Sequence, residues 1–353
     1  MKKDKVLLAE DTLRKENSQI AMEILEEGGV AEWQGFGDES IKVLGVRGGS
    51  GQVHVGDVFR AVFPTLEYLR SRGMKVVLAS SPGLEKIFSS WQDTIKIVDA
   101  SQPPEDISQI FSDCHVSHMT KWGNLHRRWK GLLKKPFDHA ARPVVKSSAL
   151  NIPHDLTLEL RRNYSEGETK KVLGIVWRTS MIGRNPDRNA SLKEFTPLIQ
   201  HKHGKWNVIS LQYGDMSVAQ HEVEGFNRKE GENIIFDPQI NPMRDYVAAS
   251  CQMAACDHIV SIDCSQVFQA GATGVPVSVL LSEEPAKQWF EFMEEGSEVC
   301  PFFPDTARIF LQKKSGDWEG PVKRAKERII HDGHLLGGWS HPAAQNIKRS
   351  MAR

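Results

Sequence analysis

The sequence predicts an α/β protein of two domains, and three observations support this class. The chain has 353 residues, more than a single hydrophobic core of ordinary size requires. Short β-branched runs alternate with helix-like segments, which is the pattern of parallel sheets with crossover helices. Two of these runs, at 41–47 and 171–178, look alike, because each ends at a basic residue and a polar loop containing glycine. We expect each run to open one domain.

The first domain is expected over 41–165, after an N-terminal extension at 1–40. Its elements are a strand at 41–47, a helix at 57–72, a strand at 75–80, and further strand–helix units near 95–99 and 106–112. Gly73 ends the helix, and a Ser-Pro-Gly turn follows the second strand. Within the extension, residues 12–27 have a helical pattern that ends at Gly28.

The second domain is expected over 166–353, with residues 163–167 as a linker. After the strand at 171–178 we expect a helix at 191–200, a strand at 206–212, a helix at 244–256, a strand at 258–262, a helix at 265–273, a strand at 276–281, and a C-terminal helix at 318–330. The two runs that open the domains are short, apolar and rich in β-branched residues, which suits strands that are buried on both faces of a parallel sheet.

Composition excludes several classes of protein. Lys+Arg and Asp+Glu are balanced at 45 each, so net charge points to no nucleic-acid partner. The five cysteines are scattered and lack a CxxC motif, which favours a reducing cytosol and argues against a structural zinc site. We find no signal peptide at the N-terminus and no run of the roughly 18 apolar residues that a membrane span needs.

One segment, at 121–137, carries six Lys/Arg residues and no acid. Its tryptophans and leucines recur at helical spacing, so a basic face adjoins an apolar face. This pattern suits a peripheral contact with a membrane surface or an acidic partner. A helix that packs on the core and has a basic outer side fits it as well.

The first strand-end loop leads to an acid, Asp57. Gly51 and Gly56 have the spacing of a phosphate loop, but Asp57 stands where that motif needs lysine. A dinucleotide fingerprint that begins at Gly49 fails as well, because His54 occupies its third glycine position. Two interpretations of Asp57 remain open: a helix cap or first-turn acid, and a functional carboxylate.

The second strand-end loop holds Arg178, Arg184 and Arg188, whose guanidinium groups are suited to bidentate phosphate binding. Asp187 is the one acid nearby in the sequence, so we expect the loop to be basic. Ser191 is expected to cap the following helix. The loop could equally be a solvated basic segment with no ligand.

Polar residues also follow the strand at 258–262, where Asp263, Cys264, Ser265 and Gln266 lead into a short helix. Open parallel sheets bind ligands at the carboxyl ends of their strands, so this position is a candidate site. The sequence contains no HExxH motif, and no GxSxG motif with a matching acid and histidine. We assign no metal site and no nucleophilic triad.

Taken together, these loops resemble a known bacterial family, the lipopolysaccharide heptosyltransferases of glycosyltransferase family 9 and related tetratricopeptide-associated glycosyltransferases. The likeness rests on three stretches, of which the first is GDVFRA at 56–61 with Pro64 and Leu66. The second consists of LGIVWR at 173–178, NASL at 189–192 and ISLQ at 209–212. The third consists of IVSIDCS at 259–265, AGA at 270–272, Gly274, Pro276, Val277, Leu281 and Trp289, and it is followed by 310–312 and 316–318 at the C-terminal end. The likeness is good over about 170–325 and weaker over 40–80.

The resemblance implies a GT-B architecture: two Rossmann-like domains with an interdomain cleft that binds a nucleotide-sugar. It implies an inverting transfer to a glycan, lipid-linked or protein acceptor, with Asp57 as the base and with no metal or other cofactor. His54, Gly56 and Arg60 would belong to the acceptor loop. The residues implied in donor binding are Arg178, Arg184, Arg188, Ser191, Gln212, Asp263, Cys264, Ser265, Gln266 and Gly271. A cytoplasmic enzyme, with a peripheral contact at the inner membrane as an option, is the expected setting.

The chain departs from the family pattern at the third loop. The family reads D-T-x-x-x-H there, and its threonine and histidine contact the donor phosphates. Here Cys264 replaces the threonine and Phe268 the histidine, which removes two strong donors. A degenerate transferase that binds a nucleotide or glycan without turnover is therefore an alternative. A nucleotide-sugar epimerase is another, although no pair of acids can be assigned to that reaction.

Overall fold

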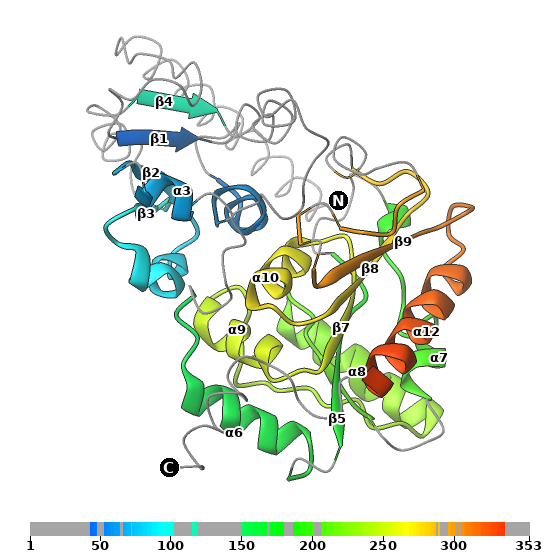
Figure 1. The fold of residues 1–353 in the computed structure, drawn as a ribbon. Helices are drawn as coiled ribbons and strands as arrows, with labels where there is room; N and C mark the ends of the chain where they lie inside the picture. Colours follow the sequence, from blue (N-terminus) through cyan, green and yellow to red (C-terminus); the bar gives the residue numbers. More distant parts are fainter. Residues whose placement is uncertain are drawn as a thin grey trace, which may run out of the picture. The chain divides into compact units, whose positions relative to one another are not determined.

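The computed structural model divides the chain into two compact units, residues 1–145 and 146–353 (Figure 1). The structure describes residues 43–47, 53–63, 66–71, 73–101, 115–118, 150–167, 170–179, 186–200, 206–286, 289, 296–300, 302–303 and 305–335. Predictions for 1–40, 106–112, 121–137 and Arg184 lie outside these residues.

The first unit is built on a parallel sheet whose strand order is β3-β2-β1-β4. Its strands are β1 (Val43–Arg47), β2 (Lys75–Ser80), β3 (Ile95–Asp99) and β4 (His115–His118). Gly45 of the central strand β1 is paired with Val77 on one side and Val116 on the other. The first three strands lie where the sequence predicts them, whereas β4 was not predicted.

The predicted helix at 57–72 is broken into three pieces: α2 (Val55–Asp57), a π-helix η1 (Val58–Val62) and α3 (Leu66–Ser71). The wide π turn is closed by Phe63, whose N–H donates to the carbonyl of Val58. A 3₁₀ segment, η3 (Leu84–Trp91), follows β2, and its Phe88 packs against Phe59 of η1 with ring centroids 5.6 Å apart.

The second unit contains a parallel sheet in the order β6-β5-β7-β8-β9. The strands are β5 (Lys171–Val176), β6 (Trp206–Ser210), β7 (His258–Ile262), β8 (Val277–Leu281) and β9 (Ala307–Leu311). Beyond β6, Ile235 adds a parallel bridge, since its N–H donates to Val208 and its carbonyl accepts from Ser210, both at 2.8 Å. When the bridge at Ile235 is counted beside β6, the strand order is that of a Rossmann sheet. In this order the direction in which successive strands are added reverses between β5 and β7.

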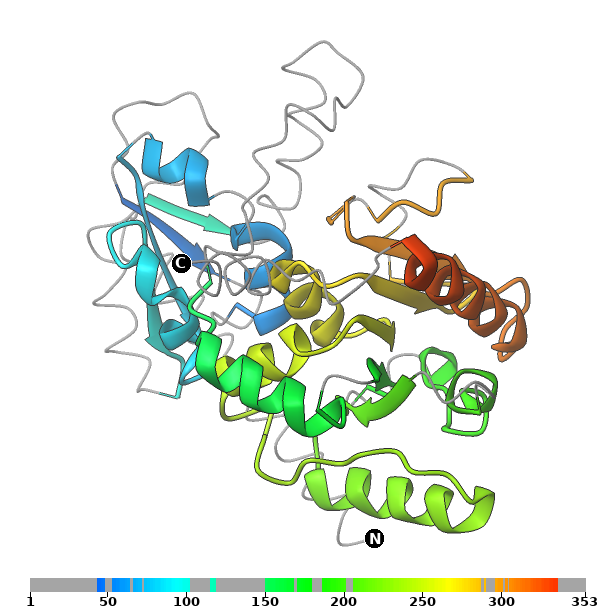
Figure 2. The same ribbon diagram turned by 60° about the horizontal axis from the view of Figure 1, so that its bottom comes forward.

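Helices cover both faces of this sheet (Figure 2). They are α6 (His154–Tyr164), α7 (Thr196–Ile199), α8 (Met216–Glu230), α9 (Tyr246–Ala254), α10 (Ser265–Thr273) and α12 (Glu319–Leu335). Helices α7 and α12 lie on the opposite face from α9 and α10 (Figures 1 and 2). Helix α10 begins and ends where the sequence predicts, and α9 and α12 lie within a few residues of their predicted ranges.

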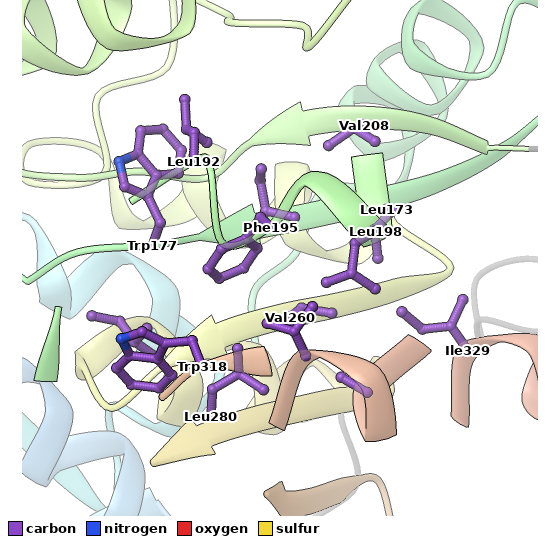
Figure 3. Close-up of a cluster of buried hydrophobic side chains, with 14 of the residues drawn as sticks. Leu173, Trp177, Leu192, Phe195, Leu198, Val208, Val260, Leu280, Trp318 and Ile329 are labelled. Atoms are coloured by element: carbon purple, nitrogen blue, oxygen red, sulfur yellow. The ribbon is translucent and has the colours of Figure 1, made fainter. Parts of the chain in front are cut away.

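A large apolar cluster fills the face under α7, α8 and α12 (Figure 3). Alternate residues of β5, Leu173 and Ile175, point into it, together with Trp177, as expected for a strand. Phe195, Trp318 and Ile329 close it from the helical side. The cluster joins β5, β7, β8 and β9 to the C-terminal helix, so α12 is an integral part of the second unit.

Two local predictions in this unit need correction. The helix expected at 191–200 is a series of turns followed by the four-residue α7, whose N-cap is Phe195, so Ser191 does not cap it. Instead, the Ser191 hydroxyl and N–H both bond Glu194 Oε2, which stabilises the preceding turn. The polar helix α8 was not predicted, because only Ala219 and Val223 of its residues are buried and its apolar pattern is weak.

Helix α6 was not predicted either, and it belongs to the second unit. It packs on α9, and its Arg161 forms a buried ion pair with Asp257 at 2.5 Å. Asp257 also accepts from the N–H of Val172, so α6 is joined to the start of β5. Residues 150–165, which the sequence assigns to the first domain, are therefore packed on the second sheet.

Candidate active site

The candidate site of the second unit lies where its strand order reverses, at the carboxyl ends of β5 and β7. Residues 177–179 follow β5, Gln212 follows β6, and residues 263–266 follow β7. In open α/β sheets a ligand crevice forms at this reversal, because the connections from the two strands leave in opposite directions. The topology thus brings together three of the sequence segments predicted to bind a donor.

Arg178 has an acidic partner that the sequence did not suggest. Its Nε donates to Glu222 Oε2 on α8 at 2.9 Å, and the indole Nε1 of Trp177 donates to the same oxygen at 3.0 Å. The Arg178 Nη2 is buried and has no hydrogen-bond partner among the residues that the structure describes. The expectation that Asp187 alone could neutralise this loop is therefore wrong for Arg178. Glu222 was missed because it lies 44 residues away on an unpredicted helix.

Arg188 connects the loop after β5 to the end of β7. Its Nη2 donates to the Asp263 carbonyl at 2.7 Å and lies 3.1 Å from Asp263 Oδ2. Its Nε is buried and has no hydrogen-bond partner within the described part of the chain. About four-fifths of this arginine side chain is buried, since 19% of it is exposed. A solvated basic loop is therefore ruled out for Arg178 and Arg188. Asp263 holds the loop in place as a buried counter-ion.

Gln212 fixes the backbone of the same loop. Its Oε1 accepts from the N–H groups of Trp177 and Arg178 at 3.2 and 3.1 Å, and its Nε2 donates to the carbonyls of Arg178 and Tyr213 at 2.7 and 3.1 Å. Because the amide is fully used in these contacts and is buried, Gln212 shapes the site rather than facing a ligand.

The rest of the loop is anchored by three further contacts. The Thr179 N–H donates to Asn189 Oδ1 at 2.7 Å, and the Ala190 N–H donates to the Trp177 carbonyl at 2.9 Å. The indole of Trp318 donates to the Asn189 carbonyl at 3.2 Å. The segment around Arg188 is thus tied to both β5 and the start of α12, which makes it a preformed part of the site.

Helix α10 presents its N-terminus at the end of β7. Its N-cap, Cys264, makes no side-chain capping bond, and the Ser265 hydroxyl donates to Gln266 Oε1 at 3.1 Å. Burial raises the pKa of the Cys264 thiol to about 11, so it is a neutral group near pH 7. A helix N-terminus carries partial positive charge and favours an anion such as phosphate.

Two residues within α10, Phe268 and Gly271, pack against neighbouring aromatic side chains. Phe268 is buried in an aromatic cluster, stacked on Trp289 with centroids 5.4 Å apart and edge-on to Phe302 at 5.5 Å. Gly271 faces the ring of Phe303, where a Cβ atom would come within 2.4 Å. Both are part of the contact between α10 and the segment before β9.

In the first unit the predicted acid lies at the carboxyl edge of the sheet. Val53 is held there, since its N–H donates to the Ala79 carbonyl and its own carbonyl accepts from the Ser80 hydroxyl. The exposed His54 is the N-cap of α2, and Asp57 is its last residue. Asp57 lies in the first turn of α2, as the first-turn interpretation predicts, but its side chain makes no capping bond to η1 within the described residues. Its carboxylate is instead paired with Arg60 at 2.6 Å.

Three further features of the described part of the chain concern its cysteines, metal-binding side chains and membrane-spanning helices. Its four cysteines are free and buried. No group of three or more His, Cys, Asp or Glu side chains there is arranged to hold a metal ion. No helix there is both long and apolar enough to cross a membrane.

Two Rossmann-like α/β units in one chain are the architecture of GT-B glycosyltransferases, so the predicted fold class is confirmed. Solved structures with this fold include a family 9 glycosyltransferase from Veillonella parvula (TM-score 0.52, 14% identity, 84% of this chain and 97% of that one). They also include the E. coli ADP-heptose lipopolysaccharide heptosyltransferase II (TM-score 0.51, 13% identity, 84% and 98%) and the E. coli heptosyltransferase WaaC with ADP (TM-score 0.51, 13% identity, 83% and 100%).

The resemblance seen in the loops is thus found again in the fold, over 83–84% of this chain. At 13–14% identity, the likeness concerns the fold. No protein-family model matches the sequence, and no curated protein shows significant sequence similarity to it.

Proposed function

We propose that the protein is a glycosyltransferase that uses a nucleotide-sugar donor. The observation that carries this proposal is the buried polar cluster at the strand reversal of the second unit, where Arg188 and Asp263 join the ends of two neighbouring strands. The fold supports it, because the likeness extends over nearly the whole length of three solved glycosyltransferases, one of them with ADP.

In this proposal the second unit binds the donor diphosphate. The N-terminus of α10, together with Arg178 and Arg188, would stabilise the charge that develops on the leaving nucleoside diphosphate. Each of these arginines keeps a buried nitrogen without a partner beside its acid. No metal or other cofactor is part of the proposal. Arg184 keeps its predicted role in the same loop.

Asp57 is the proposed base. It would take the proton of the acceptor hydroxyl as that oxygen attacks the anomeric carbon from the face opposite the leaving group, which inverts the configuration. The Asp57 side chain is 30% exposed, so it is open to solvent. The acceptor would be a glycan, a lipid-linked sugar or a protein, in the cytoplasm. Contact with the inner membrane through 121–137 remains a prediction.

The test is the release of nucleoside diphosphate from a panel of nucleotide-sugars, including ADP-heptose, with candidate acceptors. Asp57→Asn should lower turnover by about 10²- to 10⁴-fold, the usual contribution of a general base, while nucleoside diphosphate binding stays unchanged. Asparagine keeps the shape of the side chain beside the buried Arg60. Full turnover in this variant would show that Asp57 is not the base.

A second candidate function, binding without turnover, is favoured by Phe268. This residue stands where the family places a phosphate-contacting histidine, and here it is part of an apolar cluster. Saturable binding of a nucleotide-sugar with no release of nucleoside diphosphate, across donors and acceptors, would support this function over transfer.

A further inference from the structure

Arg60 is a buried charged residue in the first unit. It lies within the π-helix η1, whose residues are all buried, and only 8% of Arg60 is exposed. A buried guanidinium is costly unless it is paired and hydrogen-bonded. π-Helical turns inside helices are frequent at functional sites, so a buried arginine at this turn suggests a specific task.

Arg60 is directed at the carboxylate of Asp57. Its Nη2 donates to Asp57 Oδ1 at 2.6 Å and its Nε points to the same oxygen at 3.3 Å. Both contacts therefore go to Oδ1. Within the described residues, the structure records no hydrogen bond to Oδ2. The pairing thus divides the carboxylate into one oxygen that is held and one that is left for another partner.

The segment that carries Arg60 is itself well anchored. Phe59 and Phe63 both pack against Phe88 of η3, with ring centroids 5.6 and 6.2 Å away. The π turn is closed by the Phe63 N–H on the Val58 carbonyl. Packing on both sides of Arg60 therefore fixes its backbone, and the guanidinium can hold Asp57 in one orientation.

We propose that Arg60 is a positioning residue for Asp57, an inference that rests on the proposed function of Asp57 as base. Arg60 holds Oδ1, so that Oδ2 faces the acceptor hydroxyl. In the transfer step the acceptor oxygen forms its bond to the anomeric carbon, the bond from that carbon to the phosphate oxygen breaks, and the hydroxyl proton goes to Oδ2. Because Arg60 is buried, it acts through Asp57 rather than by binding the acceptor itself.

The experiment is a double-mutant cycle in the full-length chain, using the donor that shows release in the panel. Turnover and donor KM are measured for Asp57→Asn, Arg60→Gln, Arg60→Lys and the double variant Asp57→Asn/Arg60→Gln. Arg60→Gln should lower kcat by about 10- to 100-fold, the cost of misplacing a catalytic group, with donor KM unchanged. Arg60→Lys, which keeps one charged donor, should recover part of this loss.

The double variant distinguishes positioning from independent action. If Arg60 acts through Asp57, adding Arg60→Gln to Asp57→Asn should cause no further loss of turnover. The same fold loss in both backgrounds would overturn the inference. If Asp57→Asn has no measurable turnover, equal losses in Arg60→Lys and Arg60→Gln would overturn it instead. Full turnover in Asp57→Asn would reject the proposed base, whereas a loss there combined with full turnover in Arg60→Gln would reject the positioning role alone.

Arg70→Gln is the matched control for folding effects. Arg70 belongs to the same unit, pairs with Asp93 at 2.7 Å and stacks over Trp91, but it has no contact with Asp57 among those recorded. Its variant should keep full kcat. Thermal unfolding of each variant, read by tryptophan fluorescence, shows whether a loss of turnover comes from loss of the fold.

Discussion

At the scale of single residues, each arginine that the structure describes at the two sites is paired with an acid. Arg178 bonds Glu222, Arg188 bonds Asp263, and in the first unit Arg60 bonds Asp57. Buried guanidinium groups require such partners, because leaving one unpaired costs several kcal/mol. A phosphate bound at the second unit would therefore meet a network that is close to neutral, in which the arginines are already oriented. Affinity would then rest on orientation and on the α10 N-terminus more than on excess charge.

His258 gives a residue-level prediction for pH dependence. This histidine is buried on β7 and its Nε2 lies 2.9 Å from the Ser278 hydroxyl. Burial, with a smaller effect of the Arg328 charge, lowers the pKa of His258 well below its ordinary value. In the unfolded chain its pKa is about 6.5, so as pH falls the unfolded state binds the proton first. The stability that neutral His258 contributes is present above about pH 6.5 and is lost below it.

Urea unfolding at a series of pH values tests this prediction. His258→Asn keeps a neutral polar side chain, so the free energy of unfolding should fall less steeply with acid than in the unmodified chain. The difference should reach about 1.4 kcal/mol one pH unit below the unfolded pKa. His221→Gln, an exposed histidine on α8, should show the slope of the unmodified chain. Identical slopes for the His258 variant and the unmodified chain would contradict the prediction.

At the scale of elements, α10 is defined by its sequence and placed by its aromatic contacts. Cys264 in extended conformation begins it, and Gly274 with φ of 82° ends it, as glycine does at a helix C-terminus. Its sides are set by packing, with Phe268 in the aromatic cluster and Gly271 against Phe303. The position of the helix N-terminus at the site therefore depends on contacts made further along the helix.

Gly271→Ala should destabilise the second unit. The added methyl group would lie 2.4–2.8 Å from atoms of the Phe303 ring, so the ring or the helix must move. Overpacking of this kind costs about 1–3 kcal/mol. Gly225→Ala on α8 is the matched control, because nothing lies within 4 Å of its added Cβ. That control should gain about 0.5–1 kcal/mol from lower chain entropy. Urea unfolding of both variants measures the two effects, and equal effects would contradict this view of α10.

At the scale of the whole molecule, the two proposed tasks lie in different units. The candidate base Asp57 is in residues 1–145, whereas the polar cluster around Arg188 is in 146–353. The second unit has its own sheet, helices on both faces and the apolar cluster of Figure 3, so it has the parts of an independent folding unit. Binding and transfer should therefore be separable by dividing the chain.

Residues 146–353 expressed alone should bind nucleoside diphosphate and release none from a nucleotide-sugar. Binding measured by calorimetry should be within about threefold of the full chain, a difference below 1 kcal/mol. Arg188→Ala in this fragment is the control, and it should weaken binding, since the segment that carries Arg188 loses its contact with β7. A fragment that folds, as judged by circular dichroism, but binds no nucleotide would contradict the assignment of the donor to the second unit.

The sequence by itself determined most of the strands, although not β4 and β9, and their alternation with helices. Runs such as 75–80, 171–176 and 258–262 are rich in apolar and β-branched residues, and they form strands that are buried over most of their length. Helix α10 was also predicted within its bounds, because a polar strand end precedes it and a glycine ends it. The polar ends of β5 and β7, and so the location of the candidate site, follow from the same pattern.

Only the tertiary structure decided what those polar residues do. The acid that pairs with Arg178 is Glu222 of α8, and the side chain that hydrogen-bonds the backbone of its loop is Gln212. Neither residue is a neighbour of Arg178 in the sequence. Asp57 is a first-turn acid, as one interpretation of the sequence had it, but its pairing with Arg60, three residues further on, was found only in the structure. Local patterns fix elements through hydrogen bonds between near neighbours, whereas ion pairs and aromatic contacts join distant segments and form only when the sheets are assembled.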